Sequence, residues 1–130
     1  MFLTMLNDEQ KRAFSVLAHR LAAADGKISR EEGEALRNMK AELGVADSGL
    51  DDRDESDLAA VFNDQRSRVV ALLELLGVAH SDHEFQLDER SMVTVVAHEM
   101  GFAATDLERF DNWVRGYAAH VEAALAMMAE

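Results

Sequence analysis

Apolar side chains recur along the chain at intervals of three and four residues, which is the spacing of one face of an α-helix. The first such stripe consists of Phe14, Leu17 and Leu21. It predicts a helix that is capped by Asn7 or Asp8 and runs to about residue 24. The pair Asp25-Gly26 then ends it, because glycine readily adopts the left-handed conformation that stops a helix.

The same spacing predicts further helices, separated by glycine or by polar loops. Their expected ranges are 30–43, 57–62, 64–80, 87–100 and 105 to nearly the C-terminus. Asn63 or Asp64 would cap the helix over 64–80. Ser29–Glu32 and Thr105–Glu108 have the residue types of a capping box. The acidic, polar residues 45–56 have no such period and predict the longest loop.

Two of these helices have distinctive apolar faces. Residues 64–80 are apolar around most of the circumference, so we expect this helix to be central and covered by its neighbours. The last helix has one apolar stripe at this spacing, which comprises Leu107, Phe110, Val114, Tyr117, Val121, Leu125 and Met128. Trp113 and Tyr117 lie four residues apart. We expect this pair to be core; the alternative is an exposed aromatic patch.

The composition favours a single all-α domain and restricts its partners. A chain of 130 residues buries one core, and 48% hydrophobic residues suffice for it. Proline is absent, which favours uninterrupted helices. The net charge of −12 would repel phosphate backbones and anionic lipids, so nucleic acid is not expected as a partner. Cysteine is absent, which excludes disulfides, thiolate zinc sites and cysteine nucleophiles.

Membrane and export signals are not expected in this sequence. No apolar run approaches the length of a membrane-spanning helix, so direct membrane insertion is not expected. The apolar opening Met1–Leu6 is short and is followed at once by Asp8 and Glu9, unlike a secretory signal. We therefore expect a cytoplasmic protein.

Two segments align without a gap, which indicates an internal duplication. Asp25–Glu32 matches Asp82–Glu89: both begin with aspartate, have an apolar residue at the fourth position and end with glutamate. Downstream, Glu42–Val45 matches Glu99–Phe102. We therefore expect two pseudo-repeated halves, each with a helix, a short acidic loop and a second helix.

The duplicated acidic loops are candidates for a cation site, because carboxylate oxygens suit Ca²⁺, Mg²⁺ and Mn²⁺. The candidate ligands are Asp25, Glu32, Asp82 and Glu89. Further donors nearby are Glu84, Asp88, His80 and His83, and the histidines would suit Zn²⁺. The alternative is structural, since Asp-Gly is a common turn and a glutamate three residues after a serine is a capping device. An EF-hand is not expected, because Leu21 and Ala23 stand where that loop needs Asp or Asn.

Residues 22–32, Ala-Ala-Ala-Asp-Gly-Lys-Ile-Ser-Arg-Glu-Glu, end one predicted helix and open the next. With the second copy at 78–89 and Met100-Gly101-Phe102, this stretch resembles the TerB-like domain of tellurite-resistance proteins and the N-terminal domain of DjlA-type co-chaperones. The resemblance covers nearly the whole chain, which departs from the family at His83, where the second copy often has glycine.

That resemblance implies an all-α fold of about seven helices in two related halves, and a site for a divalent metal. The residues onto which the site would fall are Asp25, Glu32, Asp82 and Glu89. It also implies a role in resistance to tellurite and other stresses, with partners that include membrane-bound components. Fold likeness alone does not define an activity, which has to be argued from a site.

Two functions remain open at this point. One is a non-enzymatic stress-response module of TerB type that binds Ca²⁺, Mg²⁺, Mn²⁺ or Zn²⁺ through its acidic loops. The alternative is a metal-free protein–protein interaction domain, of adaptor or co-chaperone type, whose surface is the 45–56 loop or the last helix. Both predict a protein partner, and the chain itself is expected to be a monomer or a homodimer. A hydrolase is not expected, because His19, His98 and His120 accompany no recognisable catalytic motif.

Overall fold

The computed structural model describes residues 2–24, 53–80 and 87–129, together with the helical positions Glu34, Arg37, Asn38 and Ala41. These residues form a short 3-10 helix, five α-helices and no strand, which confirms the all-α class for the described part of the chain. The elements are η1 (Leu3–Met5), α1 (Asp8–Ala22), α3 (Glu55–Ala60), α4 (Gln65–Ala79), α5 (Leu87–Glu99) and α6 (Ala104–Met128). The acidic loop sequences 25–31 and 81–86, and most of the helix predicted over 30–43, lie outside the described residues.

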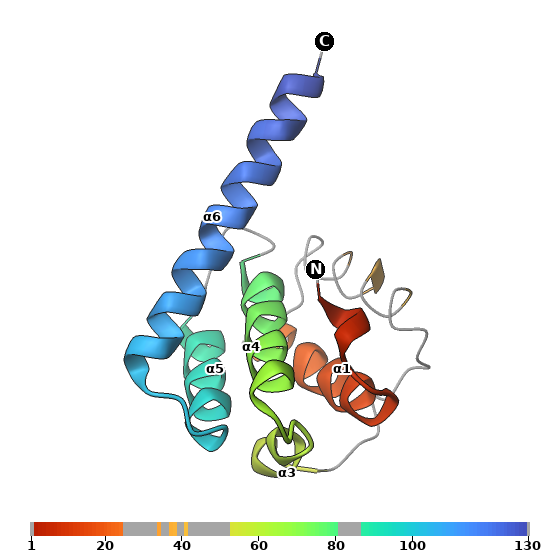
Figure 1. Ribbon diagram of the computed structural model, residues 1–130, viewed down its shortest axis with the longest axis vertical. Helices are drawn as coiled ribbons and strands as arrows, with labels where there is room; N and C mark the ends of the chain where they lie inside the picture. Colours follow the sequence, from red (N-terminus) through yellow and green to blue (C-terminus); the bar gives the residue numbers. More distant parts are fainter. Residues whose placement is uncertain are drawn as a thin grey trace.

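Helix α4 stands at the centre of the fold, as its all-round apolar sequence predicts. It packs against η1, α1, α5 and α6 (Figure 1). Its fully or almost fully buried side chains include Val70, Ala71, Leu72, Leu75 and Leu76. Helix α3 covers the lower end of the molecule and packs against α1 and α5. The buried apolar side chains of these elements form one continuous core.

Side-chain caps begin α1 and α4 where the sequence predicts them. The Asn7 side chain accepts from the Gln10 N–H at 2.8 Å, and the Gln10 side chain accepts from the Asn7 N–H at 3.0 Å. At α4, Asp64 Oδ1 accepts from the Ser67 N–H at 2.7 Å. The hydrogen bonds from the Ser67 side chain and backbone hold the pKa of Asp64 below its ordinary value.

Two other helix starts differ from the prediction. Helix α3 begins at Glu55, because the Asp54 side chain accepts from the Asp57 N–H at 2.8 Å, so residues 55 and 56 are helical instead of belonging to the 45–56 loop. Helix α6 begins at Ala104, so the capping box predicted at Thr105–Glu108 is wrong. Instead, the Asp106 carboxylate accepts from the Ala103 N–H at 3.0 Å, three residues back along the chain.

Gly101 ends α5, as expected, with a positive φ of 87°. The Phe102 N–H donates to the Ala97 carbonyl at 3.0 Å across this turn, which is the bond of a Schellman cap. The chain then turns directly into α6, so α5 and α6 lie side by side.

The apolar stripe of the last helix lies in the core only in its first half. Phe110 and Val114 are 6% and 2% exposed, and they face the core. Tyr117, Val121, Leu125 and Met128 are exposed instead. The physical reason is length, because α6 has 25 residues and its C-terminal half extends past the ends of α4 and α5 (Figure 1).

Candidate functional site

The four predicted metal ligands cannot be assembled from the described residues. Asp25, Glu32 and Asp82 lie outside them, as does His83. Glu89 lies in the first turn of α5 and is only 2% exposed. Within the described ranges, no group of three or more histidine, aspartate and glutamate side chains is placed to hold a metal ion. The predicted cation site therefore stays a prediction, with Glu89 as its one described member.

His80, a further donor named for the predicted cation site, contacts a carboxylate of α6. It ends α4, and its Nε2 lies 2.6 Å from Asp111 Oδ1 in α6. Asp111 Oδ2 also lies 3.2 Å from Arg115 Nε, one turn further along α6. The side chains of His80 and Asp111 are 16% and 19% exposed, so this pair is partly shielded from water. It joins the end of α4 to the N-terminal half of α6.

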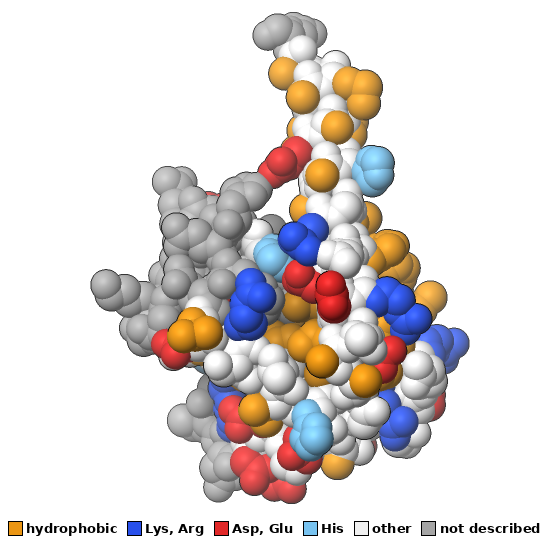
Figure 2. Space-filling model, turned by 90° about the vertical axis from the view of Figure 1, so that its left-hand side faces the viewer, with side chains coloured by type: hydrophobic (Ala, Val, Ile, Leu, Met, Phe, Trp, Pro, Cys, Tyr) orange, Lys and Arg blue, Asp and Glu red, His pale blue; other side chains and the backbone are white. Residues whose placement is uncertain are grey.

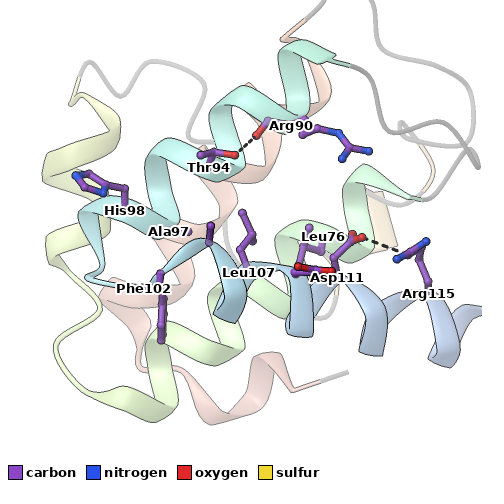
Figure 3. Close-up of a pocket in the computed structure, with 12 residues that line it drawn as sticks. Leu76, Arg90, Thr94, Ala97, His98, Phe102, Leu107, Asp111 and Arg115 are labelled. Atoms are coloured by element: carbon purple, nitrogen blue, oxygen red, sulfur yellow. Dashed lines mark hydrogen bonds and ion pairs between the residues drawn. The ribbon is translucent and has the colours of Figure 1, made fainter.

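A groove of about 570 Å³ runs between α5 and α6, next to this pair (Figure 3). Its volume falls in the usual range for small-ligand pockets. The lining consists of Leu76, Arg90, Thr94, Ala97, His98, Phe102, Ala103, Ala104, Leu107, Glu108, Asp111 and Arg115. The Thr94 hydroxyl donates to the Arg90 carbonyl at 2.8 Å, and Asp111 is bonded as described. The groove thus combines the apolar side chains of Leu76, Phe102 and Leu107 with polar ones, of which Thr94, Asp111 and Arg115 have protein partners.

Among the described residues, six of the exposed large apolar side chains lie on α6. We call this surface the α6 stripe, and its residues are Trp113, Tyr117, Val121, Leu125, Met127 and Met128. Each of these side chains is between 41% and 82% exposed. Figure 2 shows hydrophobic side chains gathered along the projecting part of α6. At 100° per residue they fall within an arc of roughly 160° on one side of the helix.

The base of the α6 stripe is an ordered aromatic cluster. Trp113 and Tyr117 are stacked, with ring centroids 5.5 Å apart and an interplanar angle of 18°. The Phe2 ring lies 5.9 Å from that of Trp113. Trp113 and Tyr117 are nevertheless 45% and 43% exposed, so the prediction that they lie in the core is wrong. The four-residue spacing brings the rings together but cannot show whether another element covers them.

The charged side chains of α6 are concentrated in its N-terminal half. The first half of α6 contains Asp106, Glu108, Arg109, Asp111 and Arg115, whereas residues 116–129 contain one charged side chain, that of Glu122. In a chain with a net charge of −12, this is an unusually neutral segment. The predictions from sequence include the apolar stripe but not this contrast, which a count of charges along the helix would have revealed.

No family model, no curated protein and no solved structure matches this chain. None of the helices in the described residues has both the length and the apolar character needed to cross a bilayer.

Proposed function

We propose that this protein is a non-enzymatic binding module that docks a protein partner on the α6 stripe. The observation that carries the proposal is the exposure of six large apolar side chains on a helix that has left its own core. Taking about 200 Å² for a large side chain, their exposed parts amount to roughly 700 Å², more than the largest apolar patch of a typical monomer.

The residue types of the α6 stripe also favour a protein partner. Tryptophan, tyrosine and methionine are enriched in the centres of protein interfaces, where aromatic side chains contribute much of the binding energy. Trp113 and Tyr117 are held by stacking, so little side-chain entropy is lost when a partner covers them. The flexible Met127 and Met128 at the tip can adapt to the contours of the partner.

Photo-crosslinking from defined positions in cells tests this surface. A photoreactive amino acid at Val121 samples the α6 stripe, and the same amino acid at Ala119 samples the other side of the helix as a matched control. We expect a defined adduct from position 121 and little from position 119. The adduct is then identified, and Leu125→Glu should weaken its binding to the purified chain at least tenfold. Equal labelling from both positions, or none, contradicts the proposal.

We further propose that this module has the TerB-like architecture of two pseudo-repeated halves and about seven helices, and that it acts in resistance to tellurite and other stresses. Support comes from the central α4, from the glycine stop after α5 and from the capped start of α6. The test is growth on tellurite after deletion of the gene. Restoration by the native chain but not by the Leu125→Glu variant would tie that resistance to the α6 stripe.

Binding of a divalent cation by the acidic loops is a second candidate function. The observation that favours it is Glu89, a carboxylate that is 2% exposed beside one of the predicted acidic loops. A cation bound only by the folded chain must raise its melting temperature as the cation concentration exceeds the dissociation constant. We expect Ca²⁺, Mg²⁺, Mn²⁺ or Zn²⁺ to raise the melting temperature and Asp25→Asn with Asp82→Asn to abolish the shift. An unchanged melting temperature for all four cations would remove this function.

A further inference from the structure

We infer that the protein covering the α6 stripe is a second copy of this chain, and that the two α6 helices pack antiparallel through their projecting halves. This rests on the proposed function and names its partner. Four observations carry it: a heptad repeat, the position of the core, the charge of the helix and the exposed area.

The apolar positions of α6 follow a repeat of alternating three- and four-residue steps. They are Leu107, Phe110, Val114, Tyr117, Val121, Ala124 and Met128. This is the heptad pattern with which one helix packs along another. Its first half, through Val114, packs against the chain's own core, whereas its second half continues on the same side of the helix with no such cover in the described residues. The projecting half of α6 therefore presents apolar heptad positions that no other described helix covers.

The position of the core decides the orientation of the pair. The core lies on the side of α6 that carries the heptad positions, along the N-terminal half of the helix (Figure 1). A second helix laid parallel along the projecting half would bring its own core into the space that this core occupies. An antiparallel helix brings its core to the opposite end, beyond the tip of α6. The overlap is residues 116–128, a length of about 20 Å at 1.5 Å per residue.

The charge distribution favours a second copy over a charged partner. Two chains that each have a net charge of −12 repel each other, and an antiparallel pair keeps their acidic globular parts apart. Within the overlap, Glu122 is the one charged side chain. A basic partner helix would find few acidic residues beside the α6 stripe, whereas an equally neutral helix meets no repulsion there. Ala124 is one of the heptad positions in this segment, and its small side chain allows two helices to approach closely.

The exposed area is sufficient for a symmetric dimer. The five residues of the α6 stripe that lie within the overlap expose roughly 600 Å² on each copy at about 200 Å² per side chain. This area is at the lower end of the roughly 600–1,000 Å² per partner of a standard interface. In an antiparallel pair with heptad positions facing one another, Val121 meets Ala124 of the second copy, and Tyr117 meets Met128. The latter pairing places methionine sulfur against an aromatic ring, which is a favourable contact.

The oligomeric state of the purified chain tests the dimer. By sedimentation equilibrium we expect twice the chain mass of 14.4 kDa, with a dissociation constant that Leu125→Lys raises at least tenfold. Ala119→Lys, an exposed change on the other side of α6, should alter it by less than twofold. Circular dichroism checks that both variants stay helical. A native chain that remains monomeric at millimolar concentration, or that binds neutral lipid vesicles as a monomer, overturns the inference.

Single cysteines test the orientation, since the chain has none of its own. The Val121→Cys and Ala124→Cys variants should form a mixed disulfide when combined, and much less of either homodimer. Self-crosslinking of each variant alone would show a parallel pair and overturn the antiparallel arrangement. A monomeric chain that still forms a face-specific adduct with another protein in cells would overturn this inference alone. Absence of any adduct from position 121 would remove the proposed function as well.

Discussion

The imidazole of His80 and the carboxylate of Asp111 meet at 2.6 Å and join the end of α4 to the N-terminal half of α6. Since the last contacts of α6 with the core lie near Val114, this pair stands close to the point where the helix leaves the core. It therefore contributes to the angle at which the α6 stripe is presented.

Removal of this pair should loosen α6. We expect Asp111→Ala to lower the free energy of unfolding by about 1–3 kcal/mol, the range for a partly shielded hydrogen bond to a charged group. Urea denaturation measures the loss, and a double-mutant cycle with His80→Ala isolates the pair. Arg115→Ala is the control, because its more exposed ion pair should contribute about 0.5 kcal/mol. Equal effects of the two single changes would contradict this role of His80.

The buried Glu74 should hold the N-terminal segment on the core. Its Oε1 accepts from the Phe2 N–H at 2.6 Å, and Phe2 in turn lies against Trp113. We expect Glu74→Ala to lower the free energy of unfolding by about 1–3 kcal/mol. It should also shift the fluorescence of Trp113, the only tryptophan, to longer wavelength as Phe2 moves away. Glu108→Ala, a change of an exposed glutamate on α6, should leave the emission unchanged.

Gly101 and Gly116 should respond in opposite ways to the same change. Gly101 has a φ of 87°, so Gly101→Ala forces alanine into a left-handed conformation and should cost about 1–2 kcal/mol. Gly116 lies inside α6 with nothing within 4 Å of an added Cβ. Gly116→Ala should therefore stabilise the chain by about 0.5–1 kcal/mol. Thermal unfolding of both variants checks the signs, and a loss of stability in each would show that the turn or the helix is placed wrongly.

Acid should weaken the start of α4 through Asp64. Its folded pKa is lowered by hydrogen bonds from Ser67, so the carboxylate stabilises the fold above the unfolded value of 3.8. That contribution is lost as pH falls from about 3.8 through the lowered folded pKa. Asn caps a helix about as well as Asp but does not titrate. We therefore expect the stability of the native chain relative to Asp64→Asn to fall over this pH window. A constant difference across it would rule the effect out.

Local signals made the helices predictable, whereas contacts distant in sequence were not. Asn7, Asp64 and Gly101 act within one turn of their own position, so their roles can be read from neighbouring residues. The pair of His80 and Asp111 spans 31 positions and no short pattern marks it. Periodicity likewise identified the apolar side of α6 without showing which half of it the core would cover. Of the predicted metal ligands, only Glu89 lies in the described residues, so that site remains a prediction.

The exit of α6 from the core gives the chain two regions under different constraints. Substitutions before Val114 disturb packing that every copy needs in order to fold, and selection would remove most of them. Beyond Gly116 the side chains contribute little to that packing, so mutations there can accumulate with little loss of stability. New recognition properties could therefore evolve at the helix tip while the fold stays the same.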